Sequence, residues 1–287
     1  MAISDKLLLL PTIPTYLMST FEQQFARIQA NIERKKQQQL MENQPDHELL
    51  KNSVTKSNAL CRAYYRFGLV EKRCMEALIS KLHPQKTNID LQHITLGAKE
   101  YGEAFDVHEK TAYRDIASAV DILMHRVIWA DRPGGKPGKI QYTLMSSAEY
   151  KDDEGQIECV FNPQIVPHLV GLKQQFAKYP LGKAVSFTSS YTWRLYELLV
   201  SWSEDPADTD GLLMGWLTVE VDELRRMLGI PESYKWSDVQ RQVLDTVQHE
   251  LLDKSNIELQ ITRKKTGRRI SHLKLEFMEI KRLSPLE

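Results

Sequence analysis

The sequence predicts an α+β protein built from two tandem copies of a helix–helix–hairpin unit, and three observations support this prediction. Between Tyr234 and Phe277, a stretch with an apolar residue at every fourth position changes into two stretches of alternating polar and apolar residues. The same order of patterns occurs once before, between Thr55 and Tyr142. In both copies a basic segment that contains glycine separates the alternating stretches, as expected for the turn of a β-hairpin.

Length and composition permit two such domains. The 287 residues suffice, because domains commonly hold about 100 to 150 residues. Lys and Arg total 38, as do Asp and Glu, so any binding to nucleic acid would depend on cations gathered on one surface. We expect a helical appendage over residues 1–50, a first winged-helix domain over 51–162 and a second over 163–287.

The appendage is expected to contain a short amphipathic helix. Apolar residues recur at helical spacing from Phe21 to Ile32. Four apolar positions favour packing on the body of the protein or on a partner over zipper-like dimerisation. The run Leu7–Leu10 ends at Pro11, too short for a signal peptide or a membrane span, so a cytoplasmic protein is expected.

The first copy of the unit can be placed element by element. Its first helix is apolar on one face and stops at His83–Pro84, because proline cannot continue a helix. A short strand or the entry to a helix is expected over residues 94–96, a second helix over 98–105 and a third over 109–125. Two strands then flank the basic turn 133–139. The candidate contact residues of the third helix and of the turn are Lys110, Thr111, Arg114, Lys136 and Lys139.

The second copy repeats this order. A helix is expected from Leu217 to Gly229, since glycine suits the C-terminal end of a helix. The next helix runs from Ser237 to Asp253 and is expected to open with a capping box between Ser237 and Gln240. Its apolar face comprises Val239, Val243, Leu244, Val247 and Leu251. Its polar first turn and the residue two positions before it supply the candidates Lys235, Ser237, Gln240, Arg241 and Gln242.

A hairpin with a cationic tip follows this helix. Alternating apolar residues predict two strands, and the basic run 263–269 between them turns at Gly267. The candidate phosphate-contacting residues of the tip are Lys264, Lys265, Arg268 and Arg269. A polar helix followed by a cationic hairpin is typical of a winged helix-turn-helix, in which the helix enters a major groove and the hairpin lies along phosphates. An ordinary αβ-hairpin with a solvated loop would give this pattern once, but two copies favour two DNA-binding units.

A succession of short motifs in a consistent order extends over residues 57–277. The motifs are Ser57–Leu60, Ala77–Leu82, Phe161–Pro163, Leu169–Leu172, Gln175–Leu181, Ser190–Leu199, Leu228–Tyr234 and Lys264–Arg268. In this succession the chain resembles the RepE and RepB type replication initiators of iteron-containing plasmids. Residues 1–50 carry no such motif and are left out of the resemblance.

The resemblance implies two tandem winged-helix domains, related by pseudo-two-fold symmetry, that bind directly repeated origin sites as a monomer. It further implies a homodimer that represses its own promoter at an inverted repeat, and host initiator, helicase and chaperones as partners. No catalytic activity, cofactor or membrane contact is implied. Relatives often carry a run of arginines where this chain has residues 240–242. Gln240 and Gln242 would shift base preference towards adenine, whereas Arg241 would favour guanine.

Other function classes are less well supported by the residues. A winged-helix transcriptional regulator without an initiation role is the alternative, and an enzyme is a distant third. The segment Gly134–Lys139 lacks the P-loop pattern, and the eight histidines show no metal-binding spacing. Three cysteines without a CxxC pair are expected to be reduced core thiols; they are Cys61, Cys74 and Cys159.

Overall fold

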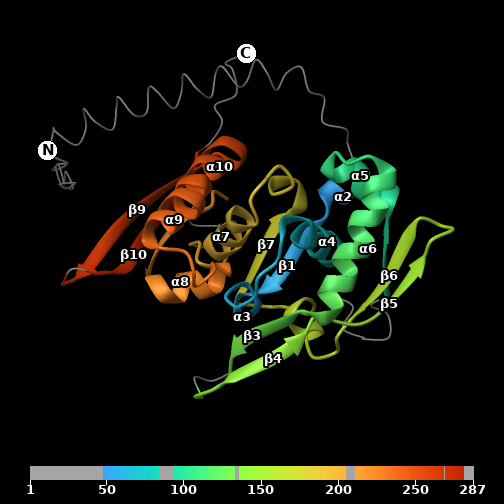
Figure 1. Cartoon of the computed structure of the whole chain (residues 1–287), viewed down its shortest axis with the longest axis horizontal. Coiled ribbons are helices and arrows are strands. Elements are labelled where there is room, and N and C mark those ends of the chain that lie inside the picture. Colours follow the sequence, from blue (N-terminus) through green and yellow to red (C-terminus); the bar gives the residue numbers. More distant parts are fainter. Residues whose placement is uncertain (1–47, 84–92, 133–135, 205–210, 268, 281–287) are drawn as a thin grey trace, which may run out of the picture. The chain divides into compact units, whose positions relative to one another are not determined.

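The computed structural model describes residues 48–83, 93–132, 136–204, 211–267 and 269–280 (Figure 1). Residues 47–287 belong to one compact unit. The amphipathic helix expected in the N-terminal appendage lies outside the described residues. None of the helices within the described ranges combines the length and the apolarity needed to cross a membrane.

The first helix–helix–hairpin unit is built on a three-stranded antiparallel sheet. Its elements are α4 (Leu69–Ser80), β2 (His93–Gly97), α5 (Ala98–Phe105), α6 (Glu109–His125), β5 (Met145–Lys151) and β6 (Gln156–Phe161). Strand β6 lies in the centre, so the sheet order is β2–β6–β5. Helices α5 and α6 have the expected bounds, and α6 buries Ile116, Val120 and Leu123 against the core. The helical periodicity of the sequence therefore predicted this part of the unit correctly.

The second unit has the same topology. Its elements are α7 (Ser190–Ser201), β8 (Met214–Glu220), α8 (Val221–Leu228), α9 (Trp236–Asp238), η5 (Val239–Leu244), α10 (Asp245–Ser255), β9 (Ile257–Thr266) and β10 (Arg269–Glu279). Strand β10 lies in the centre, which gives the order β8–β10–β9. In both units a helix precedes a strand, two further helices and a hairpin, and the first strand pairs with the second strand of the hairpin. This shared order confirms the predicted pair of tandem winged-helix domains.

The helix expected from Leu217 to Gly229 is shorter than predicted. Residues up to Glu220 form strand β8, because buried Leu217 and Val219 alternate with exposed neighbours. Helix α8 begins only at Val221. It ends, as predicted, at Gly229, which adopts the left-handed conformation with φ 66°.

The first unit contains an additional hairpin that changes which segment is its wing. Strands β3 (Val127–Asp131) and β4 (Lys139–Thr143) pair with each other, so the expected hairpin around the basic turn is confirmed. They form a separate two-stranded sheet, however, and the position equivalent to β9–β10 is taken by β5–β6. The topological wing of the first unit therefore carries the acidic turn Asp152–Gly155 at its tip. Basic composition at 133–139 identified a hairpin but not its place in the sheet order.

A second two-stranded sheet joins segments that lie far apart in the chain. Strand β1 (Ser53–Ser57) pairs antiparallel with β7 (Phe176–Pro180). The short helices α2 (Glu48–Lys51), α3 (Asn58–Cys61), η3 (Val166–His168) and η4 (Leu181–Lys183) lie next to these strands in the sequence. The pairing connects a segment of the expected first domain with a segment of the expected second domain, and neither segment was predicted to be a strand.

Five charged side chains are buried together in the core near this sheet. They are Lys56, Lys72, Glu76, Arg194 and Glu197. The ammonium nitrogen Nζ of Lys72 lies 2.6 Å from a carboxylate oxygen of Glu76 and 2.6 Å from one of Glu197. The Lys56 ammonium contacts the same two carboxylates. Each buried charge thus has oppositely charged partners, as a stable buried ionic cluster requires.

Arg194, on α7, connects this cluster to the end of α8 and to the segment that follows β1. Its Nη2 donates hydrogen bonds to the carbonyl oxygens of Cys61 and Ala63, at 3.1 and 3.0 Å, and to that of Met227, at 2.9 Å. Met227 lies in the last turn of α8, where carbonyl groups have no partner within the helix. One guanidinium group therefore ties the end of α8 to the segment that follows β1.

Candidate nucleic-acid interface

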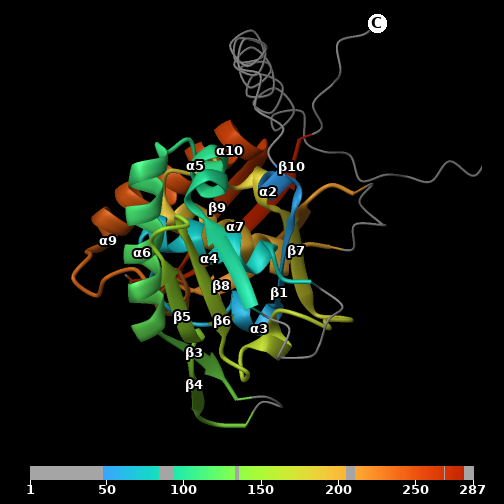
Figure 2. The same ribbon diagram turned by 90° about the vertical axis from the view of Figure 1, so that its right-hand side faces the viewer.

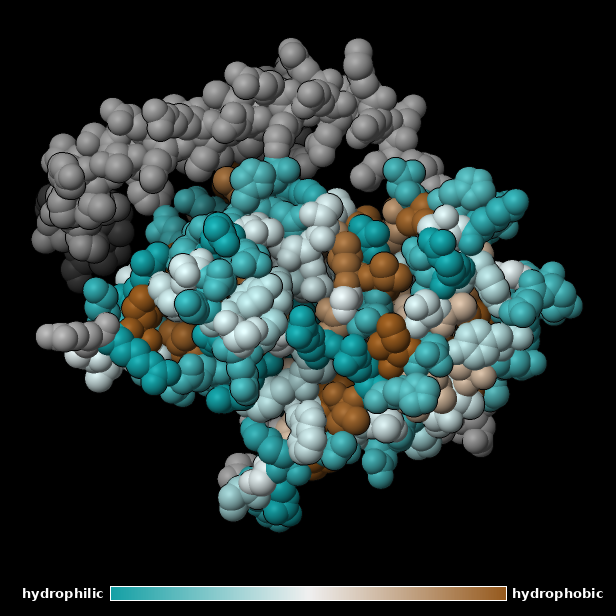
Figure 3. All heavy atoms as spheres, in the orientation of Figure 1, coloured by the Kyte–Doolittle hydropathy of each residue, from teal (hydrophilic) through white to brown (hydrophobic). Residues whose placement is uncertain are grey.

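The two candidate recognition helices lie towards the same side of the protein. Figure 2 places α6 and α9 on the side that faces the viewer in Figure 1, and β1 and β7 on the opposite side. The space-filling view of the face seen in Figure 1 shows mainly hydrophilic residues, with apolar residues scattered among them (Figure 3). A polar face with two exposed helices suits a hydrated, charged ligand better than an apolar partner.

The recognition helix of the second unit begins earlier than predicted. Lys235 is its N-cap, and its backbone N–H donates to Oδ2 of Asp238 at 3.1 Å. The expected capping box between Ser237 and Gln240 is therefore wrong. The Asp238 carboxylate, near the positive end of the helix dipole, is a stronger acceptor than the amide oxygen of Gln240, and the helix therefore begins two residues earlier than expected. Ser237 and Lys235 are both exposed at this end of the helix.

The middle of this helix, η5, is a π-helical turn, which changes the set of neighbouring side chains. It brings Gln240 next to Asp245, and Nε2 of Gln240 donates a hydrogen bond to Oδ1 of Asp245. Oε1 of Gln240 accepts a hydrogen bond from Nη2 of Arg263 on β9, at 2.9 Å. Both ends of the Gln240 amide are engaged, so this side chain links the recognition helix to the hairpin.

Arg241 and Gln242 are held much more loosely than Gln240. The Arg241 side chain is 76% exposed, with Nη2 3.6 Å from Oδ1 of Asp238. Nε2 of Gln242 lies 3.4 Å from the same oxygen, which is a long and weak hydrogen bond. Both side chains are therefore available to hydrogen-bond an external partner at little cost.

The hairpin β9–β10 presents its cations to solvent. Lys264, Lys265 and Arg269 are exposed, and Arg268 lies outside the described residues. Nη2 of Arg269 contacts Oδ2 of Asp222 on α8 at 2.5 Å. The Arg263 guanidinium lies 5.7 Å from the centre of the Trp236 ring, so this half-buried tryptophan stacks near the base of the hairpin as well as on the core.

The candidates on α6 form a second polar group. Lys110 and Arg114 are exposed, Thr111 is half-buried, and the Arg114 side chain is 75% exposed despite a 3.7 Å contact with Asp115. The hydroxyl of Tyr113 donates a hydrogen bond to Asp152 in the acidic turn, which raises the pKa of Tyr113 to about 12. The turn therefore lies against the recognition helix of its own unit.

The two candidate lysines of the hairpin β3–β4 differ from each other in their surroundings. Lys136 is exposed. Nζ of Lys139 lies 4.4 Å from the centre of the Tyr64 ring and 3.4 Å from its hydroxyl. Tyr64 also bridges to Trp129 of β3 through backbone hydrogen bonds. This hairpin is thus fixed to the segment before α4.

The structure gathers the predicted residues into three places rather than one. Those of the second unit lie at the start of the recognition helix, on η5 and on the hairpin β9–β10, whereas those of the first divide between the start of α6 and the hairpin β3–β4. Sequence reasoning counted Arg263 only among the cations of the tip and missed its contact with Gln240. No local signal could have found this pair, because the two residues lie 23 positions apart on different elements.

Two tandem units with this topology, each with an exposed recognition helix followed by a hairpin, define a winged-helix protein of the DNA-binding class. Two family models match the chain: "Initiator Replication protein, WH1" over residues 53–200 and "Initiator Rep protein, WH2" over residues 220–277. The chain belongs to this family of replication initiator proteins.

Two individual relatives agree with the family. The chain is 25% identical over 214 residues to the "Replication initiation protein" of Escherichia coli, covering 74% of this chain and 65% of that relative's length. The crystal structure of the Pi initiator protein in complex with iteron DNA matches with a TM-score of 0.67 and 20% identity. This match covers 81% of the present chain and 99% of the other, and it supports the fold.

Proposed function

We propose that this protein initiates plasmid DNA replication by binding directly repeated origin sites as a monomer, helping to open the origin and recruiting host replication proteins. As a dimer it would repress its own promoter at an inverted repeat. The main observation in support of this proposal is that one chain has two exposed recognition helices on one face. Membership of the initiator family favours initiation over a purely transcriptional role.

The two units would read two successive major grooves on one side of the duplex. Consecutive major-groove segments on one face lie about 34 Å apart, one helical turn. The residues offered by the two helices differ, since one presents Lys110 and Arg114 and the other Arg241 and Gln242. A single chain therefore suits an asymmetric site, and several chains would suit copies of that site in the same orientation. This is why direct repeats fit the monomer and an inverted repeat requires two chains.

Base contacts and phosphate contacts would divide between helix and hairpin. Arg241 can donate two hydrogen bonds to guanine, and Gln242 can pair with adenine. The lysines of the hairpins would contact phosphates and contribute affinity without sequence preference. The solved complex of the Pi initiator with iteron DNA supports the same assignment of ligand for this chain.

A replication assay separates an initiator from a regulator. A circular DNA that carries this gene and its flanking sequence, but no other origin, is expected to be maintained in a bacterial host. A variant with Arg241, Lys264 and Lys265 all changed to Ala is expected to abolish maintenance. Repression of a reporter by the wild-type protein without any maintenance of the circle would favour the regulator.

A further inference from the structure

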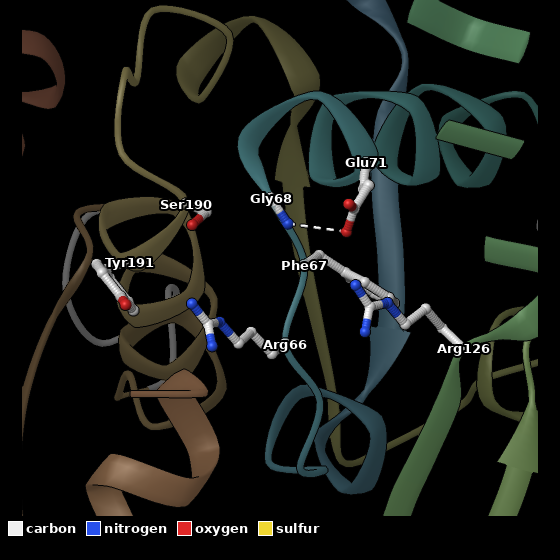
Figure 4. Close-up of a pocket in the computed structure, with 7 residues that line it drawn as sticks. All are labelled: Arg66, Phe67, Gly68, Glu71, Arg126, Ser190 and Tyr191. Atoms are coloured by element: carbon white, nitrogen blue, oxygen red, sulfur yellow. Dashed lines mark hydrogen bonds between the residues drawn. The ribbon is translucent and has the colours of Figure 1, made fainter. Parts of the chain in front are cut away.

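A cavity of about 350 Å³ is lined by residues from both halves of the chain. Its lining residues are Arg66, Phe67, Gly68, Glu71, Arg126, Ser190 and Tyr191 (Figure 4). The cavity lies where the first residues of α4 and α7 approach the junction of α6 with β3. None of these residues was among the candidates identified from the sequence.

Two arginines give this cavity its charge. Arg126, the residue after α6, extends towards Phe67, and Arg66 extends towards α7 near Ser190 and Tyr191 (Figure 4). Both are exposed, and within the described part of the chain neither forms a hydrogen bond or an ion pair. A guanidinium carries five N–H donors in a geometry that matches phosphate oxygens, so two of them beside one cavity favour an anion.

The single acidic lining residue does not neutralise this pair. Oε2 of Glu71 accepts a hydrogen bond from the backbone N–H of Gly68 at 2.8 Å, which fixes the carboxylate at the start of α4. Neither arginine forms an ion pair with Glu71. Two arginines and one glutamate leave the cavity with a formal charge of +1.

The position of the cavity indicates which anion it would meet. In Figure 1, α4 and α7, which carry Glu71, Ser190 and Tyr191 of the cavity lining, lie between α9–α10 on one side and α6 on the other. If the two helices occupy major-groove segments about one turn apart, a stretch of sugar–phosphate backbone must cross the space between them. The arginines would then meet phosphates that neither helix reaches.

We propose that Arg66 and Arg126 form a phosphate-binding clamp for the duplex backbone between the two major-groove segments. This inference rests on the proposed function, since it needs both units bound to one duplex. The clamp would carry no base preference, because phosphates are the same at every position. Its role would be to fix the register of one unit relative to the other.

The test compares a full binding site with its two halves. The probes are a duplex covering the segment that the protein protects beside its own gene, and two shorter duplexes that each contain one major-groove segment. Binding of Arg66→Ala/Arg126→Ala is measured by fluorescence anisotropy over a range of salt concentrations. On the full duplex the double variant is expected to bind about 100-fold more weakly, roughly tenfold for each lost charge-assisted contact. The slope of log K against log salt should become shallower by about two.

On the half duplexes the double variant is expected to bind as the wild type does. Lys178→Ala is the matched control, because Lys178 is an exposed cation on β7, on the side away from α6 and α9. Arg66→Lys/Arg126→Lys, which keeps both charges, is expected to retain the salt slope. Glu71→Gln is expected to tighten binding to the full duplex a few-fold, since it removes a charge that repels phosphate but leaves an oxygen to accept from Gly68.

Three outcomes would each contradict either the phosphate clamp or the proposed function. Unchanged affinity and slope on the full duplex would overturn the clamp while leaving the proposed function intact. An equal loss on full and half duplexes would also overturn it, because the arginines would then act within one unit. A wild-type protein that binds none of the duplexes would instead contradict the proposed function. Thermal unfolding of each variant at the wild-type temperature shows that the fold is retained.

Discussion

Gln240 and Arg241 are adjacent in the sequence, yet their side chains have different neighbours. Gln240 is held by Asp245 and Arg263, whereas Arg241 is largely exposed. A side chain that is already hydrogen-bonded at both ends must break those bonds to contact a base. We therefore assign base discrimination to Arg241 and Gln242, and the positioning of the hairpin to Gln240.

Arg241→Ala is expected to weaken binding by about 1 to 3 kcal/mol and to relax discrimination at one base pair. Gln240→Ala is expected to weaken binding to all sequences alike, because it releases Arg263 from the helix. Competition binding against a set of single-base-pair substitutions of the site measures both effects. A uniform loss from Arg241→Ala would place that residue on the backbone instead.

The buried charges make a separate prediction about stability. Burial raises the pKa of Glu76, but the ammonium groups of Lys56 and Lys72 outweigh this effect and lower its pKa to about 2. A carboxyl group with a lowered pKa stabilises the fold above its unfolded value of 4.5, and this contribution is lost as the pH falls from 4.5 towards 2. Glu76→Gln is expected to reduce the free energy of unfolding at pH 7 and to flatten its decline below pH 4.5.

Urea unfolding at several pH values measures this dependence. Glu158→Gln is the matched control, because Glu158 is also paired, with Lys151, but lies at the surface. The control is expected to change stability little at pH 7. A Glu76→Gln variant with wild-type stability at pH 7 would contradict the stabilising role of the cluster.

At the scale of elements, we propose that the lysines of hairpin β9–β10 contact phosphates without base preference, whereas the recognition helices contact bases. Lys264→Ala and Lys265→Ala are each expected to lower affinity for all sequences and to reduce the salt slope by about one. Both side chains are exposed on β9, so their loss should not affect folding. Anisotropy titrations at several salt concentrations test this, with Lys178→Ala as a control. A change in base preference on loss of either lysine would contradict the assignment.

The sequence determined the helices better than the strands and the helix ends. The apolar periodicity over 98–105 and 109–125 predicted both helices with their observed bounds, because apolar residues that recur at helical spacing are typical of a helix with one buried face. Strand β5 was missed as an element: only Met145 of its seven residues is buried, and its pairing with β6 shifts register after Met145. The π-helical turn at Val239–Leu244 could not be predicted from the sequence, since it depends on contacts that exist only in the folded protein.

Some residues of the candidate site could likewise be predicted from the sequence, and others could not. Residues with a polar, helical or glycine-rich context, such as Arg241 and Lys264, could be selected from the sequence and are exposed as expected. Arg66 and Arg126 could not, because they lie 60 positions apart and only the fold brings them to one cavity. The N-cap was predicted at Ser237 because serine is a favoured N-cap residue, whereas the structure has Lys235 there, with its N–H bonded to Asp238 three residues on.

At the scale of the whole molecule, two contacts join the end of α8 to the segment that follows β1. Arg194 binds carbonyl groups on α8 and on the segment after β1. Gly229 lies so close to Tyr65 that an added Cβ would be 2.9 Å from the Tyr65 carbonyl oxygen, and its φ is +66°. Both contacts hold the end of α8 against the segment that follows β1.

Arg194→Met is expected to lower the free energy of unfolding by about 3 to 5 kcal/mol, because it removes a cation from a buried cluster and leaves three carbonyl groups unpaired. Arg73→Met is the control, since Arg73 is partly buried and, within the part of the chain that the structure describes, donates one long hydrogen bond, 3.4 Å, to the Phe187 carbonyl oxygen. Urea unfolding compares the two variants. Equal losses would show that Arg194 has no special role in joining the units.

The central claim is that one chain, through two different winged-helix units, occupies one asymmetric site. The most direct test is a DNase footprint of the purified full chain on the DNA that flanks its gene. We predict regularly spaced protected segments in the same orientation, each covering about two helical turns, roughly 20 base pairs, for two major-groove contacts one turn apart. A single protected inverted repeat, with no direct repeats, would contradict this account.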